Sequence, residues 1–270
     1  MRPEPQLDDL LECATACARA AGNHALANWS RRSEVCQAFA HDVKLRLDVE
    51  CQAQADAVIR ARFPAHEILG EETVPDRPRA GPPAEFVWIV DPIDGTVNFS
   101  HGFPVWCCSV AVQRRGEVVA GVVYAPALAA LYQVTLDGPA LCNGVPLRVS
   151  AVDSLASALV FTGMDKNLDP ALPPYALFER LAARTQKARI VGAAALDLCQ
   201  VAAGHGDGYF EAGIYLWDVA AAGLMVRRAG GRAEILGHQP GNRLRFLATN
   251  GRIHEALKNL VDTDSKTDGI

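Results

Sequence analysis

The sequence lacks an excess of positive charge: 26 Lys and Arg stand against 31 Asp and Glu, which gives a formal net charge of −5 at pH 7. A dedicated nucleic-acid-binding protein needs a basic face to neutralise phosphates, so the composition argues against that class. It does not exclude a phosphorylated substrate, because an acidic site can recruit metal ions that hold phosphate. The 50% hydrophobic and 21% charged residues are the balance of a globular protein rather than a disordered or fibrous one.

A targeting segment is also missing from the N-terminus. Residues 1–10 contain one early Arg followed by acids and lack the apolar core of a secretory signal, so we expect a cytoplasmic protein. Two 19-residue windows, Gly95–Gln113 and Val118–Leu136, lack Asp, Glu, Lys and Arg and have the length of a membrane span. Pro104 and Pro126 would lie within such spans, so buried strands joined by turns are the better interpretation, and we expect no membrane partner.

The eight cysteines include no Cys-x-x-Cys pair, which removes the usual basis for a structural zinc site. A disulfide framework is not expected in a chain of this length without a secretory signal. We therefore predict buried, free thiols in a reducing compartment. The sequence has no internal repeats or low-complexity stretches, and its 270 residues suit one large or two small domains.

Hydrophobic periodicity predicts a mixture of helices and strands. Apolar residues at helical spacing favour helices over residues 7–29 and about 48–63. A five-residue apolar run, Phe86–Val90, favours a buried strand that is ended by Asp91-Pro92. The other predicted elements are strands at 105–112, 118–124, 131–136, 158–161 and 189–191, a local strand from 43, an Asn-Gly hairpin at 143–144, and helices at 175–184, 194–203 and 218–228, the last capped by Gly230-Gly231.

Carboxylates stand at the ends of apolar segments in three motifs. These are Gly70-Glu71-Glu72, Asp91-Pro92-Ile93-Asp94-Gly95-Thr96 and Trp217-Asp218-Val219-Ala220-Ala221. Pro92 fixes φ between Asp91 and Asp94, so both carboxylates can face one side, and Gly95 lets the backbone approach a ligand. A helix that begins near Thr96 would present free amides to an anion. Because converging carboxylates cannot all stay ionised without cations, and clustered oxygen ligands select Mg²⁺, the motifs predict a metal-assisted phosphate site.

The three motifs resemble those of the inositol monophosphatase family, within the wider lithium-sensitive, Mg²⁺-dependent phosphatase superfamily. Their order and separations fit that family, and the resemblance covers about residues 7 to 260. It implies an α+β fold, the layered αβαβα sandwich of inositol monophosphatase and fructose-1,6-bisphosphatase, with the site between two halves. We expect an N-terminal half at 1–150 that carries most metal ligands, a C-terminal half at 151–262 that carries the substrate contacts, and a flexible tail at 263–270.

The resemblance also implies which residues bind metal. Glu71, Asp91 and the backbone carbonyl of Ile93 would hold the first Mg²⁺, and Asp91, Asp94 and Asp218 would hold the second. Taken alone, Asp218 is more simply explained as the N-cap of the helix that follows it, so its place in a metal site depends on the three motifs together.

The same resemblance implies the catalytic and substrate-binding residues. Glu71, Thr96 and Asp94 are the expected catalytic residues, with Thr96 and Glu71 orienting the attacking water. Ala193 stands where the family usually has a hydroxyl residue, which removes one potential sugar contact. Glu211 resembles a residue that hydrogen-bonds inositol hydroxyls, although a surface acid at a strand end is the plainer interpretation. The expected substrate contacts are Gly95, Thr96, Gly192, Ala193, Ala194, Glu211 and Asp218.

One segment departs from the family pattern, which usually reads Asp-x-Val-Thr-x-x-Asp with a Lys shortly before it. Here Leu45 takes the Thr position and Gln37 stands near the Lys position, whereas Asp42 and Asp48, which would assist an optional third metal, keep their places. Alternation of apolar and polar residues over 43–48 favours a strand and a more rigid element. We therefore expect third-metal binding and the lithium response to differ in this chain.

These features predict a phosphatase with two or three Mg²⁺ ions that hydrolyses inositol monophosphate or a similar small polyol phosphate. A broader sugar phosphatase, like fructose-1,6-bisphosphatase, is the alternative within the class. A family-like scaffold that mainly binds a partner, for example the transcription machinery, is the alternative outside it. Loss of some metal-site acids would be expected in such a scaffold, and here all are present. A homodimer is implied by the resemblance alone.

Overall fold

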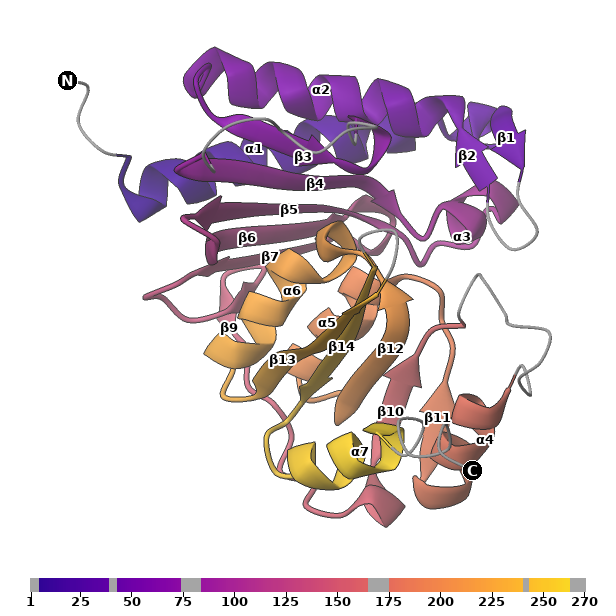
Figure 1. Cartoon of the computed structure of the whole chain (residues 1–270). Coiled ribbons are helices and arrows are strands. Elements are labelled where there is room, and N and C mark those ends of the chain that lie inside the picture. Colours follow the sequence, from indigo (N-terminus) through magenta and orange to yellow (C-terminus); the bar gives the residue numbers. More distant parts are fainter. Residues whose placement is uncertain (1–4, 39–42, 74–83, 165–174, 240–242, 263–270) are drawn as a thin grey trace.

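The computed structural model of the chain describes residues 5–38, 43–73, 84–164, 175–239 and 243–262 (Figure 1). The predictions for Asp42 and for the tail at 263–270 fall outside these residues.

Helices and sheets alternate in layers (Figure 1). Two long helices cover one face of a seven-stranded sheet, two helices lie between that sheet and a five-stranded sheet, and two shorter helices cover the outer face of the second sheet. This order is the predicted αβαβα sandwich. Taken layer by layer, the helices are α1 (Leu7–Ala27) and α2 (Arg46–Arg62), then α5 (Ala194–Ala202) and α6 (Leu216–Arg228), then α4 (Ala176–Arg184) and α7 (His254–Val261).

The seven-stranded sheet has the order β3-β4-β5-β6-β7-β8-β9, parallel between β3 and β4 and antiparallel elsewhere. The two uncharged windows contribute strands to its middle, and no helix among the described residues is long and apolar enough to cross a membrane. Its strands are β3 (Glu67–Gly70), β4 (Phe86–Asp94), β5 (Cys107–Arg114), β6 (Glu117–Ala125), β7 (Ala130–Thr135), β8 (Leu141–Cys142) and β9 (Val145–Pro146).

The five-stranded sheet has the order β11-β10-β12-β14-β13. Strand β10 runs parallel to both of its neighbours, whereas β14 is antiparallel to β12 and β13. Its strands are β10 (Leu159–Thr162), β11 (Lys187–Arg189), β12 (Gly208–Ile214), β13 (Arg232–Gln239) and β14 (Arg243–Thr249). The remaining elements are the β1–β2 pair (Val35–Ala38 and Val43–Leu45), α3 (Thr96–His101), and the 3₁₀ turns η1 (Trp29–Arg31), η2 (Glu71–Thr73), η3 (Pro126–Leu128) and η4 (Leu155–Ser157).

Strand β4 does not end where the sequence predicts. It continues through Asp91-Pro92 to Asp94, and its register against β5 shifts between Asp91, opposite Ser109, and Asp94. Proline has no N–H to give to the ladder, and a bulge leaves such a residue unpaired without ending the strand. The expectation of a break at Asp91-Pro92 is therefore wrong, and the motif acids lie on the irregular end of a central strand.

The segment at 43–48 is a strand only in its first half. Val43–Leu45 forms β2, but α2 begins at Arg46, so the alternation over Leu47 and Asp48 does not predict the structure correctly. The reason is local: the Asp48 carboxylate accepts a hydrogen bond of 2.7 Å from the Leu45 backbone N–H, which caps the helix.

The strand expected at 189–191 also lies two residues earlier, as β11, because the chain turns at Gly192 (φ 86°) to enter α5. The Asn143-Gly144 hairpin is confirmed, with φ values of 48° and 80° that suit a type I′ turn. Behind α6 the Gly231 N–H bonds to the Val226 carbonyl, which confirms the glycine C-cap.

The cysteines are free, as predicted, but they are not all buried. Six are fully enclosed and Cys142 is half-buried, whereas Cys36 is exposed on β1, a strand whose residues all face solvent. The prediction of a buried thiol is therefore wrong for Cys36. Trp88 and Trp106, by contrast, are both fully buried between the α1–α2 layer and the first sheet.

Candidate metal and phosphate site

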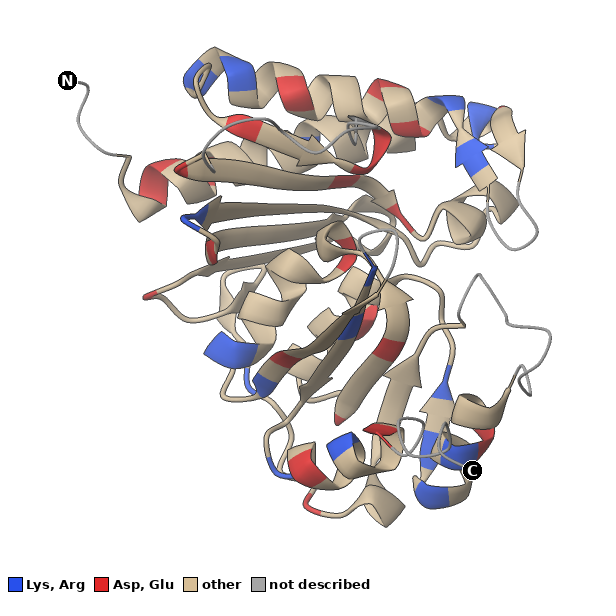
Figure 2. Ribbon diagram, in the orientation of Figure 1, with Lys and Arg blue, Asp and Glu red and all other residues tan. Residues whose placement is uncertain are grey.

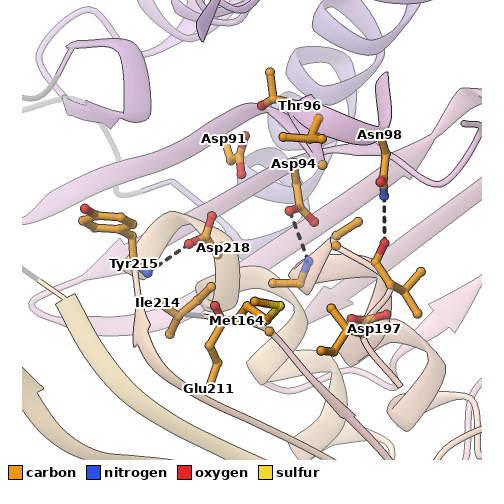
Figure 3. A pocket seen from close by; sticks show the side chains of 18 of the residues that line it. Asp91, Asp94, Thr96, Asn98, Met164, Asp197, Glu211, Ile214, Tyr215 and Asp218 are labelled. Carbon is orange, nitrogen blue, oxygen red and sulfur yellow. Dashed lines mark hydrogen bonds between the residues drawn. The ribbon is translucent and has the colours of Figure 1, made fainter. Parts of the chain in front are cut away.

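A cavity of about 600 Å³ lies where the end of β4 and the start of α3 meet the N-terminal ends of α5 and α6 (Figure 3). The expected site residues within the described chain line it together, although they come from both sheets and from the helices between them. They are Glu71, Asp91, Ile93, Asp94, Gly95, Thr96, Gly192, Ala193, Ala194, Glu211 and Asp218. Asp48, expected at an optional third metal, does not line the cavity and caps α2 instead.

Three carboxylates converge at one end of the cavity. One oxygen from each of Asp91, Asp94 and Asp218 lies within 4.8 Å of the other two. Figure 3 shows the first two reaching from β4 and the third from α6. Asp91 and Asp94 are 1% and 7% exposed, so water cannot screen their mutual repulsion. We call this group the carboxylate triad.

The electrostatics of the triad call for a cation. Burial first, and then the charges of Glu71, Asp94 and Asp218, raise the pKa of Asp91 well above its ordinary value. Burial and the Asp218 charge raise the pKa of Asp94 to about 7, against the opposing hydrogen bonds from Ala195, Cys107 and Ala194. A divalent cation favours the ionised carboxylates, and hard oxygen donors at this spacing fit Mg²⁺ or a similar ion.

Asp94 also joins the end of β4 to the start of α5. Its carboxylate oxygens accept hydrogen bonds from the backbone N–H groups of Ala194 (3.1 Å) and Ala195 (2.8 Å), at the beginning of α5. The first amides of a helix have no partner within it and carry a partial positive charge. The Ala194 amide, expected near substrate, is therefore already used to hold a metal-site acid.

Asp218 is the third residue of α6 rather than its N-cap. Its carboxylate accepts a hydrogen bond of 2.9 Å from the Tyr215 N–H, and it also hydrogen-bonds to Asp91. The N-cap position itself belongs to Tyr215, so the plainer interpretation of Asp218 is wrong in position but right in part, since the carboxylate does stabilise the helix start.

The start of α3 brings backbone close to the second half of the chain. Gly95 has φ 87°, and a Cβ there would lie 3.0 Å from the Val105 carbonyl and 3.2 Å from the Gly192 carbonyl. Only glycine combines this conformation with this approach. The Thr96 hydroxyl donates a 2.9 Å hydrogen bond to the Ile93 carbonyl, so two expected site groups fix one another.

Two lining residues were not singled out from the sequence. Asn98 donates hydrogen bonds of 2.9 Å to the carbonyls of Val105 and Val191, which ties α3 to the loop before α5 (Figure 3). Asp197 lies in α5, buried among apolar neighbours, and lines the cavity. The sequence does contain a signal for Asp197, because it is the only charged residue in the otherwise apolar run Ala193–Cys199.

The other end of the cavity is acidic as well. Glu211, on β12, accepts a 2.6 Å hydrogen bond from the Tyr209 hydroxyl, and Gly163 faces it so closely that a Cβ would overlap the carboxylate. Burial, and then the charges of Asp94 and Glu211, raise the pKa of Asp197 well above its ordinary value. We call Asp197 and Glu211 the distal pair.

A positively charged side chain, that of Lys44, lies beside this cavity but does not line it. The Lys44 ammonium, on β2, forms an ion pair of 2.5 Å with Glu72, whose side chain is 5% exposed. This hydrogen bond and the charges of Glu72, Glu71 and Asp48 raise the pKa of Lys44. Among the described residues that line the cavity itself there is no Lys, Arg or His. Figure 2 shows Lys and Arg on the outer helices α2, α4 and α7.

An αβαβα sandwich that gathers carboxylates beside helix N-termini defines a class, the metal-dependent phosphatases of small molecules. Comparison with known proteins supplies the family: the profile described as the Inositol monophosphatase family matches residues 6–264. The chain belongs to the inositol monophosphatase family, a family of metal-dependent phosphatases.

Individual relatives agree with this membership and differ in what they are named for. The Inositol-1-monophosphatase of Synechocystis sp. is 36% identical, over 93% of this chain and 88% of its own. The Nus factor SuhB of Pasteurella multocida is 35% identical, over 83% and 84%. The Fructose-1,6-bisphosphatase/inositol-1-monophosphatase of Thermotoga maritima is 32% identical, over 94% and 96%. The solved inositol monophosphatase of Anabaena (Nostoc) superposes with a TM-score of 0.82 at 32% identity, covering 94% and 96%.

Proposed function

We propose that the protein is a Mg²⁺-dependent phosphatase of small polyol monophosphates, with inositol monophosphate as its substrate. The observation that carries the proposal is the carboxylate triad, which lies at the N-terminal ends of α5 and α6 and next to the start of α3. Acids placed this closely fit two divalent cations, which in turn fit a phosphate ester.

The chain supplies ligands and orientation. Glu71, Asp91 and the Ile93 carbonyl would hold one Mg²⁺, and the triad the other, with Asp91 shared between them. When bound, the ions supply a Lewis acid that polarises the phosphate and activates water. The Thr96 hydroxyl donates its hydrogen bond to the Ile93 carbonyl. Its oxygen therefore keeps lone pairs that would accept a hydrogen bond from that water and orient it toward phosphorus.

Other residues would hold the ester on either side of the phosphorus. The Gly95 and Thr96 amides would bind phosphate oxygens at the start of α3. Gly192, Ala193 and Ala194 would border the alcohol, and Glu211 would accept hydrogen bonds from its hydroxyl groups.

We also propose a cytoplasmic homodimer with two structural halves, 1–150 and 151–262. Family membership supports the dimer, and the division agrees with the sheets, since β3–β9 lie before residue 147 and β10–β14 after 158. Gel filtration with light scattering tests the dimer: a mass twice the 28.9 kDa of the chain is expected, and a monomer would contradict it.

Two other functions are favoured by relatives' names. The Thermotoga relative favours activity on fructose 1,6-bisphosphate, and the Nus factor favours a partner-binding role. Phosphate release from the monophosphates of inositol, glycerol, histidinol and nucleosides, and from fructose 1,6-bisphosphate, separates these candidates. We expect inositol monophosphate to give the highest kcat/KM, with activity lost in EDTA and restored by Mg²⁺. No release from any ester would leave the partner-binding role.

A further inference from the structure

Asp197 presents a feature that folding does not explain. It is 3% exposed, it lines the cavity, and within the part of the chain that the structure describes its carboxyl group makes no hydrogen bond or ion pair. Its helical neighbours Ala194, Ala195, Leu196 and Leu198 are all buried and apolar.

A mostly buried carboxyl without a partner in the protein weakens a fold, because it gives up part of its hydration and receives nothing in return. Neither Asp197 oxygen is among the enclosed atoms that lack a partner, so the hydration that remains comes from the cavity. An apolar side chain would suit this position of α5 better. Residues that break a local rule in this way are expected at functional sites, where a ligand supplies the missing partner.

The position of Asp197 indicates which part of a ligand it would meet. Asp197 and Glu211 both line the cavity, and Figure 3 shows them below Asp91 and Asp94, one on α5 and the other on β12. Glu211 is fixed by the Tyr209 hydroxyl, which holds its carboxylate against Gly163. With the phosphate at the triad, the distal pair would face the alcohol half of the ester.

The charges of the cavity select the chemistry of that alcohol. Its described lining carries six carboxyl residues and no cationic side chain. Metal ions at the triad would offset the acids there. Carboxyl oxygens of the distal pair can accept hydrogen bonds from hydroxyl groups, which suits an alcohol that carries several of them.

We infer that Asp197 is a specificity residue of the proposed phosphatase: it binds hydroxyl groups of an uncharged polyol. This inference rests on the proposed function, because it assumes that the phosphate occupies the triad end.

The test compares wild type with Asp197→Ala and Asp197→Asn, and uses p-nitrophenyl phosphate, an ester whose alcohol has no further hydroxyl groups. In Asp197→Ala we expect the ratio of kcat/KM for inositol monophosphate to that for p-nitrophenyl phosphate to fall about tenfold, mainly through KM, since one hydrogen bond to the polyol is lost. In Asp197→Asn, which keeps a hydrogen-bonding side chain of nearly the same shape, this ratio should stay closer to that of wild type.

Thermal melting supplies a readout that does not depend on turnover. Removal of an unpartnered carboxyl should leave the Tm of Asp197→Ala unchanged or raised, and inositol should raise the Tm of wild type but not of this variant. The matched control is Asp207→Ala: this buried acid accepts hydrogen bonds from Ser150 and the Leu159 N–H, so its loss should lower Tm.

The possible outcomes distinguish a failure of the role inferred for Asp197 from a failure of the proposed phosphatase function. A lower Tm in Asp197→Ala, with equal losses on both monoesters, would mean a structural role and would overturn the inference while leaving the phosphatase intact. A ratio in Asp197→Asn that falls as far as in Asp197→Ala would also count against it. Absence of Mg²⁺-dependent release from every ester by wild type would instead overturn the proposed function.

Discussion

The two ends of the cavity are built from the same side chains and differ in how these are partnered. At the triad, Asp94 and Asp218 each accept hydrogen bonds from the backbone at the start of a helix. In the distal pair, the Tyr209 hydroxyl donates a hydrogen bond to Glu211, whereas Asp197 has no partner within the described chain. Backbone amides fix the triad before any cation arrives, whereas the distal pair leaves hydrogen-bonding capacity for a ligand. Partnering, rather than residue type, distinguishes an ion site from a hydroxyl site.

Removal of one triad acid is expected to have the largest effect. Asp94→Asn should lower Mg²⁺-dependent phosphate release by more than about a hundredfold, since even groups that only support metal ligands are worth about 10–100-fold. The helical circular dichroism should remain that of wild type. Asp153→Asn, at an exposed position, is the matched control and should keep full activity. Full activity in Asp94→Asn would refute the assignment of the metal end.

Substitution of a glycine tests how tightly the triad end is assembled. A left-handed backbone costs a non-glycine residue about 1–2 kcal/mol, and this is the expected loss in Gly144→Ala, where a Cβ meets nothing within 4 Å. Gly95→Ala should lose more, because the added carbon also presses on the Val105 and Gly192 carbonyls. Urea unfolding of both variants measures the difference. Equal losses would show that the close approach at Gly95 does not matter.

The pH dependence of stability should have opposite signs inside and outside the cavity. The pKa of Asp94 is raised to about 7, so in EDTA its contribution to stability is present below pH 3.8 and is lost as the pH rises through 7. The pKa of Glu50, paired with Arg31 and His24, is lowered to about 2, so its contribution is lost as the pH falls from 4.5 toward 2.

Thermal melts from pH 2 to 8 measure both limbs. Glu50→Gln should flatten the acid limb and leave the limb near pH 7 as in wild type, and added Mg²⁺ should raise Tm mostly at neutral pH. If Mg²⁺ does not change the dependence of Tm on pH near pH 7, cations do not compensate the charges of the triad.

The smallest effect is expected from Lys44, the cation beside the metal end. Lys44→Gln should lower the Mg²⁺ concentration for half-activation, because an ammonium next to Glu71 and Glu72 opposes a metal ion. A partly exposed pair is worth about 0.2–1 kcal/mol, which corresponds to a shift of about fivefold at most. Lithium titration completes the test: inhibition identical to that of an ordinary family member would contradict the expected difference in the 42–48 segment.

Local patterns predicted the elements whose structure is decided locally. Helices α1 and α2 follow from apolar spacing, and the Asn143-Gly144 turn follows from the conformations that these residues adopt. The course of β4 through Pro92 depends on pairing with β5, which the sequence does not display. Strands β13 and β14 and helix α7 were not assigned, and β13 is mostly half-exposed, with no regular alternation of buried and exposed residues.

The motifs located the site because they carry its acids: Glu71, Asp91, Asp94 and Asp218 all line the cavity, whereas Glu72 pairs with Lys44 beside it. The sequence did not indicate Asn98 and Asp197 as site residues, because their roles depend on the tertiary structure. The first matters through two carbonyls on separate segments, and the second through the absence of a partner. The cap role of Asp48 was also not predicted, since it depends on where the helix begins: α2 starts two residues earlier, and one oxygen of the carboxylate accepts the Leu45 N–H.

The two hydrogen bonds from α5 to Asp94 also limit how this fold can be recombined. They span 100 and 101 residues of sequence, and the backbone at the start of α5 positions an acid of β4. A chimera that borrows its second half from a relative must therefore reproduce the path of the chain at 194 and 195, whatever side chains it carries there. The position of one carboxylate, that of Asp94, therefore limits which segments of this fold can be exchanged.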